Sequence, residues 1–163
     1  MAIGVGVSSK LVLALAIVCA AALLAGILLE YVPVNAGHAG VFNPSFFGYG
    51  KVNISNQTYR VLLATNQTQQ LDGLMYATEA DLQELNVSGM MFVFQRSADE
   101  CFWMSNTRIP LRQAWIESNV IVYVYSATPY STASKCYNGD EVLEVPAGSN
   151  LPVNVGEVIR LGD

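Results

Sequence analysis

The chain of 163 residues is poor in the side chains on which most enzymes rely. It contains one histidine, His38, and charged residues make up only 13% of it, about half the usual share. Because this histidine lies in the predicted N-terminal tether, the predicted exported domain has none for a Ser-His-Asp triad, a Cys-His pair or a histidine-based zinc site. No Gly-rich phosphate-binding loop follows a predicted strand, so nucleotide chemistry is not indicated. The net charge of −5 argues against nucleic-acid binding, which needs a basic surface.

Hydrophobic residues are in excess instead, and much of the excess lies in one N-terminal segment. They make up 52% of the chain, and residues 11–29 form a run without a single charge. At about 1.5 Å per residue, a helix of this length spans roughly 28 Å, close to the thickness of a bilayer's hydrocarbon core. Lys10 precedes the run and Glu30 follows it. The positive-inside rule therefore predicts a cytoplasmic N-terminus at 1–10, a transmembrane helix at 11–29 and an extracytoplasmic remainder.

A cleaved secretory signal is the alternative interpretation of this run. Small-x-Ala sequences at 34–36 and 37–39 are acceptable cleavage sites and leave this alternative open. The first interpretation predicts a single-pass protein of the cell membrane, and the second a secreted protein. Both export the same domain, which we expect at residues 51–163.

Residues 30–50 are predicted to be a tether in front of that domain, because their Pro and Gly residues prevent a helix from continuing. His38 lies here without a second metal ligand nearby. The tether is also rich in aromatic side chains, which we expect either at the membrane interface or docked on the domain or a neighbour. These side chains are Phe42, Phe46, Phe47 and Tyr49.

Two features agree with export. Cys19 lies in the apolar run, which leaves Cys101 and Cys136 as a candidate disulfide outside the cell. Closing that loop would stabilise the fold by about 4 kcal/mol in the chain-entropy model, and two unpaired thiols are the alternative. The exported part also contains four N-glycosylation sequons, at Asn53, Asn56, Asn66 and Asn86.

From about Lys51 the sequence predicts short strands that are β-branched or aromatic and bounded by turn residues. The predicted strands are 59–64, 91–94, 101–104, 114–116, 120–125, 141–145 and 157–161. Residues 117–119 join two of them as a tight hairpin. One helix is predicted, from Thr78, with Asp81 in capping-box spacing and an end at Gly89. The predicted fold class is therefore α+β and mainly β, a small sheet or half-barrel with one short helix, preceded by a transmembrane helix.

The residue types present still allow two kinds of site, a pair of catalytic carboxylates and a copper site. A hydrolase with paired carboxylates would draw on Asp99, Glu100, Glu117, Glu141 or Glu144, but their spacing selects no two of them. A copper site would use the thioether sulfurs of Met75, Met90, Met91 and Met104. Methionine beside aromatic residues is more often core filler, so we expect no metal and no cofactor.

Five motifs occur in order between residues 59 and 163. They are Gly73-Leu-Met-Tyr76, Gly89-Met-Met-Phe-Val-Phe94, Phe102-Trp-Met-Ser-Asn-Thr107, Ile109-Pro-Leu111 and Val142-Leu-Glu-Val-Pro-Ala-Gly148. With the closing Val155-Gly156, this order closely resembles the domain of unknown function 192 family. The resemblance implies a small, mostly β domain, often exported behind a signal or an anchor, and it leaves the activity open.

Two positions depart from the pattern of that family. Arg112 stands where the family usually has an acidic residue after Pro-Leu, and Ser105 replaces a common Lys after Trp-Met. The loss of both members of a charge pair favours a structural duty for this loop, or a function that has drifted. Cys136 falls where members of the family often carry a cysteine.

A binding groove is predicted where an aromatic ring, an amide and a guanidinium come close in sequence. Its residues would be Trp103, Met104, Asn106, Arg112 and Tyr76. The leading functional hypothesis is nevertheless a non-enzymatic, membrane-anchored domain that acts through protein contacts. It would be an accessory or structural subunit of a membrane complex or an extracellular assembly.

Three alternatives to the accessory subunit stay open. The first is an exported module that binds a small ligand in a pocket lined by Trp103 and Asn106. The second is a filament-forming subunit, and the third an enzyme that uses two carboxylates or the cysteine pair. The expected partners are the membrane and other membrane or envelope proteins, including further copies of the chain, and not nucleic acid.

Overall fold

Seven strands and two short α-helices account for most of residues 40–162, the part of the chain that the computed structural model describes. In chain order the elements are η1 (Pro44–Phe46), β1 (Gly48–Ile54), β2 (Gln57–Ala64), α2 (Gln67–Asp72), α3 (Glu79–Glu84), β3 (Met90–Phe102), β4 (Leu111–Glu117), β5 (Val120–Ala127), β6 (Lys135–Pro146) and β7 (Ile159–Gly162). The predicted transmembrane helix at 11–29 and both cleavage sites lie outside the described residues. Among residues 40–162, no helix combines the length and the apolar character that crossing a bilayer requires.

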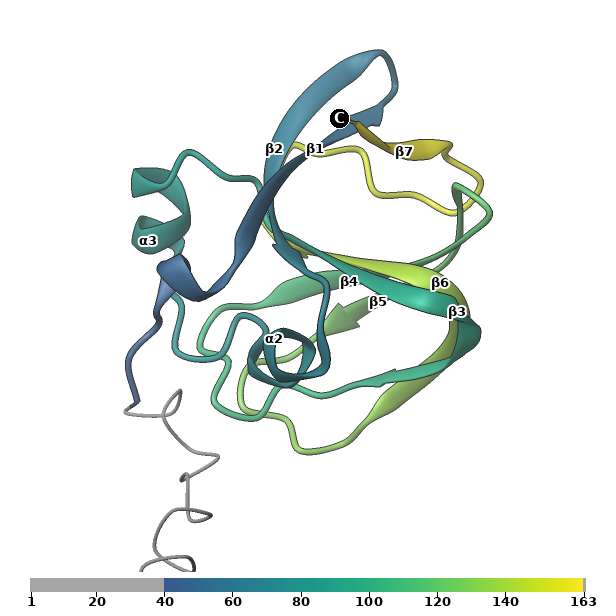
Figure 1. Cartoon of the computed structure of the whole chain (residues 1–163). Helices are drawn as coiled ribbons and strands as arrows, with labels where there is room; N and C mark the ends of the chain where they lie inside the picture. The colour runs from purple at the N-terminus through teal and green to yellow at the C-terminus, as the bar shows by residue number, and fades with distance from the viewer. Residues whose placement is uncertain (1–39, 163) are drawn as a thin grey trace, which may run out of the picture. The chain divides into compact units, whose positions relative to one another are not determined.

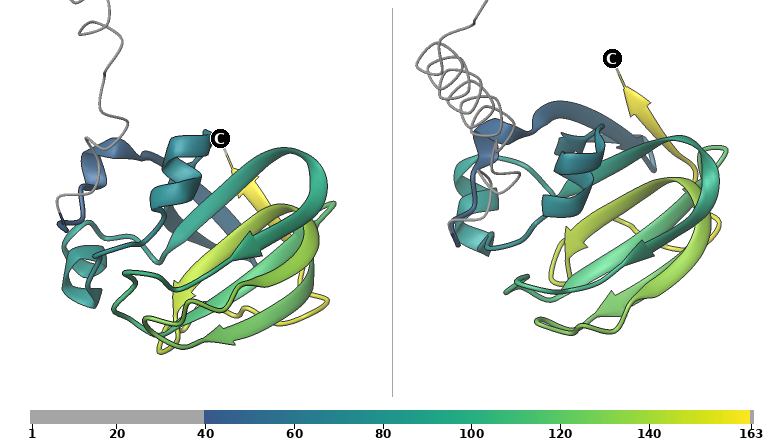
Figure 2. Two further views of the ribbon diagram at one scale, coloured as in Figure 1. Left: turned by 90° about the horizontal axis from the view of Figure 1, so that it is seen from below. Right: turned by 60° about the horizontal axis from the view of Figure 1, so that its bottom comes forward.

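The strands form one sheet in the order β5-β4-β6-β3-β2-β1-β7 (Figure 1). Every neighbouring pair is antiparallel except β2 and β3, which run parallel because the segment with α2 and α3 connects them. A bridge between Val120 and Val158 links the start of β5 to the segment before β7. The strongly curved sheet is thus a half-barrel, and both helices lie on the same side of it (Figure 2).

The sheet is buried on both faces, and alternate side chains belong to different apolar clusters. All seven strands contribute to the barrel-side core, which includes Val61, Met91, Ile116, Leu143 and Ile159. The helix-side core includes Leu62, Met90, Phe92, Trp115 and Val142, and the segments around α2 and α3 cover it. This helix-side face carries the candidate functional site described below.

The predicted fold class is confirmed in its mainly β, half-barrel form, but two predicted strands are one strand. Residues 91–94 and the first two residues of 101–104 belong to β3, which continues through a bulge between Val93 and Ala98. The intervening polar residues resemble a loop in sequence. Backbone pairing of Ala98–Phe102 with Lys135–Gly139 holds them in a strand, and it extends β6 well before the predicted start at Glu141.

The prediction of a single helix was incomplete. The helix that begins after Thr78 is present, with the predicted capping box to Asp81, although it ends at Glu84 rather than at Gly89. Gly89 has a different duty, because a Cβ at this position would lie 2.0 Å from the carbonyl oxygen of Glu144. Its lack of a side chain lets the chain approach β6 closely.

The second helix, α2, has six residues and buries none of them. A helix without a buried side produces no apolar periodicity, so the pattern of hydrophobic residues could not reveal it. Its ends were nevertheless marked in the sequence. Asn66 is the N-cap, whose Oδ1 accepts a hydrogen bond from the backbone of Gln69, and Gly73 ends the helix with a φ of 47°.

The predicted tether at 30–50 overlaps the folded domain. Strand β1 begins at Gly48, and the ring of Phe47 is buried. Phe42 and Phe46 pack against the helix-side core next to it. Of the two placements considered for these rings, docking on the domain is therefore the one observed. Tyr49 is exposed, with the guanidinium of Arg60 4.1 Å from its ring centroid.

Candidate functional site: an acidic, aromatic cavity beside the disulfide

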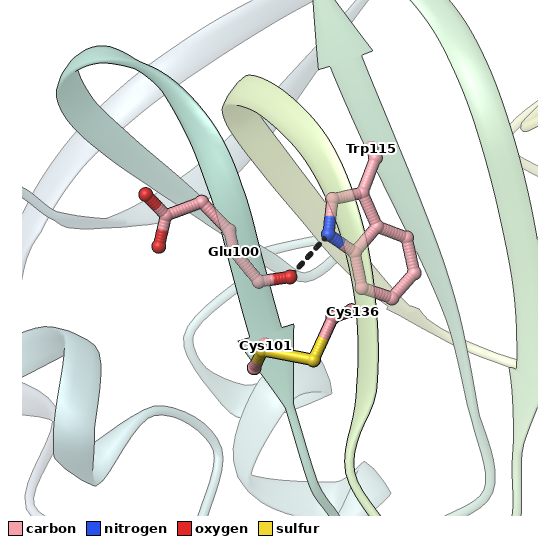
Figure 3. Close-up of a disulfide and its surroundings, with 4 residues drawn as sticks. All are labelled: Glu100, Cys101, Trp115 and Cys136. Carbon is pink, nitrogen blue, oxygen red and sulfur yellow. Dashed lines mark hydrogen bonds between the residues drawn. A yellow bond between two sulfur atoms is a disulfide. The ribbon is translucent and has the colours of Figure 1, made fainter.

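The predicted disulfide is confirmed: Cys101 of β3 and Cys136 of β6 are bonded, and they are direct cross-strand partners. Figure 3 shows this bond next to the indole of Trp115, whose Nε1 donates to the backbone carbonyl of Glu100 at 2.8 Å. The carboxylate of Glu100 points away from the indole. The disulfide and the buried indole therefore hold the part of β3 on which Glu100 lies.

A cavity of about 370 Å³ lies beside this disulfide, and its lining comes from α2 and the loop that follows it, from β3 and the loop that follows it, and from β6 and the residue before it. Four aromatic side chains form much of its apolar wall, and they are Phe92, Phe94, Phe102 and Trp103. Among the described residues of the lining, the charged side chains are three carboxylates, Asp72, Glu100 and Glu144. Neutral polar groups complete it, among them Gln67, Gln70, Thr107 and Ser134. Apolar walls with a few convergent polar groups are typical of small-ligand sites.

Glu144 is the most deeply buried of these carboxylates, since its side chain is only 4% exposed. It lies on β6 between Met90 of β3 and Gln113 of β4, which are its cross-strand partners. The Nε2 of Gln113 donates to Glu144 Oε1 at 2.9 Å and also contacts the sulfur of Met104 at 3.7 Å. Burial raises the pKa of Glu144 to about 7, and the hydrogen bond from Gln113 opposes that increase. Its charge therefore changes near neutral pH.

The aromatic wall is held by ring-on-ring contacts. Phe102 meets Phe92 edge to face at 4.8 Å between centroids, and it meets Trp115 in the same way at 5.7 Å. Such pairs are worth roughly 0.5–1.5 kcal/mol each beyond the area they bury. At the rim, Trp103 is 50% exposed and Leu71 is 61% exposed. The cavity thus has a fixed aromatic wall and an apolar, solvent-facing rim.

Of the five residues predicted to form a binding groove, Trp103 lines this cavity. Met104 does not face solvent, because it is buried in the helix-side core. Asn106 is exposed with a φ of 57°, and its carbonyl accepts a hydrogen bond from the backbone of Tyr76 at 2.8 Å. Asn106 thus lies in a turn outside the cavity lining, and its side-chain Nδ2 donates to the sulfur of Met75, which does line the cavity, at 3.8 Å.

The other two predicted groove residues also lie elsewhere. Tyr76 has a φ of 64°, and the guanidinium of Arg108 lies 5.7 Å from its ring centroid. Arg112 is adjacent to Gln113 on β4, so the two side chains leave opposite faces of the sheet. Arg112 donates to the carbonyls of Ser149 and Leu151 at 2.8 and 3.0 Å. An arginine at this position braces the loop after β6, which is a structural role.

The four methionines considered for copper are divided between different parts of the fold. Met75 lines the cavity, whereas Met90 and Met104 belong to the helix-side core. Met91 belongs to the barrel-side core, on the other face of β3 from Met90. The structure thus does not gather the four sulfurs around one point.

The carboxylates considered for hydrolysis are divided as well, but two of them, Glu100 and Glu144, line the same cavity. Burial raises the pKa of Glu100 above its ordinary value, in the same direction as for Glu144. Glu117 instead accepts hydrogen bonds from Ser97 and Asn138 at the protein surface. The sequence analysis included Glu144 among five candidate carboxylates but gave no reason to prefer it, and it did not identify Gln113 as a site residue.

A signal for both residues was present in the sequence. Along β4 and β6, every second side chain faces the helix-side core, and at these positions Leu111 and Trp115 flank Gln113, and Val142 precedes Glu144. A polar residue at an inward position of an apolar strand needs a partner. Two such residues on adjacent strands are therefore candidates for one buried polar pair.

All four sequon asparagines are exposed. Asn53 lies on β1, Asn56 and Asn86 lie in turns with positive φ, and Asn66 caps α2. Exposure is the condition that a glycan requires, and the occupancy of these sites stays a prediction.

Comparisons with known proteins agree with the fold. The family model DUF192, described as "Uncharacterized ACR", matches residues 50–161. A solved structure from Sinorhizobium meliloti 1021, provisionally assigned as a transcription regulator, has 26% identity and a TM-score of 0.59, and the alignment covers 71% of this chain and 95% of that one. A protein of unknown function from Novosphingobium aromaticivorans DSM 12444 has 24% identity and a TM-score of 0.57, with 70% and 84% covered. No curated protein is significantly similar to the chain.

Proposed function

The chain belongs to the DUF192 family, and we propose that its domain of residues 40–162 is a binding module that takes up a small ligand in the cavity beside the disulfide. One observation carries this proposal: a nearly buried carboxylate, Glu144, lines an open cavity whose wall is aromatic. Burying a carboxylate in a sheet costs free energy, and an apolar pair of similar shape is often as stable or more stable. A ligand that hydrogen-bonds to the Glu144 carboxylate would explain why a charged group is present at this buried position.

The exposure of Trp103 separates this proposal from a purely structural role for the Phe102–Thr107 segment. A structural tryptophan is normally enclosed, as Trp115 is, whereas half of the Trp103 side chain faces solvent at the mouth of the cavity. A ligand entering the cavity would cover Trp103 and the neighbouring rim residue Leu71. Covering apolar rim surface would contribute to affinity at roughly 25 cal/mol per Å².

The proposed location of the module is the extracytoplasmic face of a membrane, with residues 11–29 as its anchor. The charge-free run at 11–29, the disulfide and the four exposed sequons support this placement. We expect the full chain to stay with membranes after an alkaline wash and to be released when residues 1–39 are deleted. An intact mass that begins at residue 37 or 40 would show cleavage instead and would favour a secreted module.

Fluorescence of the full chain in detergent tests the binding proposal, because the two tryptophans report different places. A ligand in the cavity should change the emission of Trp103 and should not change the emission of the buried Trp115. A Trp103→Phe variant, in which Trp115 is the remaining tryptophan, isolates the second signal. A library of small molecules of differing charge serves as the probe set. Ser134→Phe, which places a ring in the cavity, should abolish the response.

Thr132→Phe is the matched control, since Thr132 is also exposed but lies outside the lining. Its response should equal that of the unaltered chain. A library without a single binder, or binding that Ser134→Phe leaves unchanged, would refute the binding module.

Protein contact is a second candidate role, and the exposed Leu71 and Trp103 at the rim favour it. In that role the module would be an accessory subunit, and a partner's protruding side chain would take the place of the small ligand. Mild solubilisation of membranes followed by sizing distinguishes the two roles. A co-purifying chain that is lost in a Leu71→Ser variant supports the accessory subunit, and a monomer that binds small molecules supports the module.

A further inference from the structure

We infer that the ligand of this cavity is an organic cation, a protonated amine carried on a flat or branched apolar body. The inference rests on the proposed function, because it names the chemical class that the same cavity would select. Three independent features of the lining lead to it: the sign of its charge, the aromatic rings around that charge, and the hydrogen bond already made to Glu144.

The charged side chains of the lining all carry the same sign. Glu100 of β3 and Glu144 of β6 bring two carboxylates to the cavity from neighbouring strands, and Asp72 of α2 also belongs to the described lining. The fourth element at this point, β4, contributes the neutral Gln113 beside Glu144. Carboxylates in a cleft with apolar walls concentrate their field in the cleft, which attracts cations and repels anions.

The aromatic wall suits a cation as well as an apolar body. Phe92, Phe94, Phe102 and Trp103 present π-systems to the same space that the carboxylates face. Ring faces attract ammonium groups, and the attraction grows when water is excluded. A small inorganic cation would leave most of this apolar surface uncovered. An amine with a ring or a branched chain would cover it.

Gln113 determines which atom of Glu144 meets the ligand. Its Nε2 donates to Oε1, and the carboxylate keeps further acceptor capacity, at Oε2 above all, for the N–H of a ligand. A carboxylate accepts and does not donate, and an ammonium donates and does not accept, so the two groups match. Because Glu144 is only 4% exposed, a bound ammonium would pair with it largely out of water.

Matched ligands test the inference on the full chain in a zwitterionic detergent. Phenethylamine, 2-phenylethanol and phenylacetate share a phenyl ring on a short chain and differ chiefly in charge. Titrations of Trp103 emission at about pH 8, where carboxylates ionise, should give at least a tenfold tighter Kd for the amine than for the alcohol. The anion should not bind measurably.

Variants assign the preference to the cavity. Glu144→Gln should weaken amine binding about tenfold, to the level of the alcohol, and leave the alcohol unchanged. Glu100→Gln, at a less buried position, should weaken amine binding several-fold. This second variant keeps the test valid if Glu144→Gln does not fold. Glu84→Gln is the control, because it removes the same charge from an exposed position on α3 outside the lining. It should change neither ligand's Kd.

The outcomes separate the two proposals. Equal binding of the alcohol and the amine, or an amine preference that survives both cavity variants, would overturn the cation class and leave the binding module standing. Failure of all three ligands together with a silent library would overturn the module itself. Tight binding of the anion would contradict the inference directly.

Discussion

Gln113 and Glu144 face each other across strands β4 and β6, with the amide nitrogen of Gln113 2.9 Å from a carboxylate oxygen. Both side chains lie on interior strands of the sheet and are almost fully buried. One end of this pair lies in the helix-side core, against Met104, and the other lines the aromatic cavity. The pair thus connects the stability of the domain to the chemistry of its cavity, and both should depend on pH.

The stability of the domain should fall as the pH rises through the titration of Glu144. Burial raises the folded pKa of this carboxyl from its ordinary 4.5 to about 7, so the folded state binds the proton more tightly than the unfolded state. The stabilisation is complete below the unfolded value and is lost as the pH rises through the folded one. Between about pH 4 and about pH 8, we expect a loss of roughly 2–3 kcal/mol in the free energy of unfolding. Urea titrations followed by circular dichroism measure it.

Glu144→Gln should remove most of this slope, because its amide oxygen still accepts from Gln113 and its side chain does not ionise. At about pH 8 the variant should be more stable than the unaltered chain by roughly 2 kcal/mol. Burial also raises the pKa of Glu100 and of Glu141, and this leaves a smaller slope of the same sign. Parallel curves for the two proteins would show that Glu144 is not the group responsible.

The alternation of side chains in the sequence predicts that Gln113 and Glu144 face inward, but it does not predict that they are partners. Alternation along β4 and β6 put Gln113 and Glu144 on the inward face, and pairing of the two strands puts them side by side. That β4 and β6 are neighbours follows from a topology in which β6 lies between β3 and β4. Short-range patterns do not encode such long-range pairing, so one carboxylate could not be selected from five.

The two tryptophans should separate binding from stability. Trp103→Ala should weaken ligand binding at least several-fold and change the free energy of unfolding by less than about 1 kcal/mol, since half of its side chain is already exposed. Trp115→Phe should instead destabilise the fold by roughly 2–3 kcal/mol. It leaves the Glu100 carbonyl without its donor and a void among the surrounding rings. Circular dichroism and ligand titration on both variants provide the comparison, and a reversed pattern would contradict the assigned roles.

The disulfide should contribute most of the stability expected from closing its loop. Cys101 and Cys136 are 35 residues apart in sequence, and the chain-entropy model gives about 4 kcal/mol for a loop of this size. The Cys101→Ser/Cys136→Ser double variant should lose about this amount in urea titrations. Its ligand binding should weaken too, because Cys101 belongs to the cavity lining. A double variant as stable as the unaltered chain would show that the sheet alone fixes the two strands.

Three elements were missed from the sequence: strand β1, whose first residues were assigned to the tether, helix α2 and the middle of β3, and the last two share a physical cause. Helix α2 buries no side chain, and the middle of β3 exposes polar residues, so neither has the apolar period on which prediction relies. What fixes them is local capping by Asn66 in one case and backbone pairing with β6 in the other. Part of the cavity lining comes from these two segments, namely Gln67, Gln70, Leu71 and Asp72 of α2 and Glu100 of β3. The fold class was therefore predictable, whereas of the site the sequence named single residues, among them Trp103, Glu100 and Glu144, and not their grouping around one cavity.

Asn66 should prove to have two separable roles, one in folding and one in modification. Its Oδ1 accepts from the backbone of Gln69 and caps α2, while its Nδ2 is the atom to which a sequon glycan is attached. Asn66→Ala removes both roles and should cost about 1 kcal/mol of stability. It should also weaken ligand binding, since Gln70, Leu71 and Asp72 on this helix line the cavity.

Two further variants divide these roles. Asn66→Asp keeps an oxygen for the cap and removes the sequon, and Thr68→Ala removes the sequon and leaves Asn66 in place. Both should retain the stability of the unaltered chain and lose the glycan mass at this site when the protein is expressed in a host with N-glycosylation. If Asn66→Asp were as unstable as Asn66→Ala, the cap would not be the source of the loss. If the unaltered chain carried no glycan at Asn66 in such a host, the role of Asn66 would be to cap α2 alone. Support for an exported location would then come from the disulfide and from the membrane extraction.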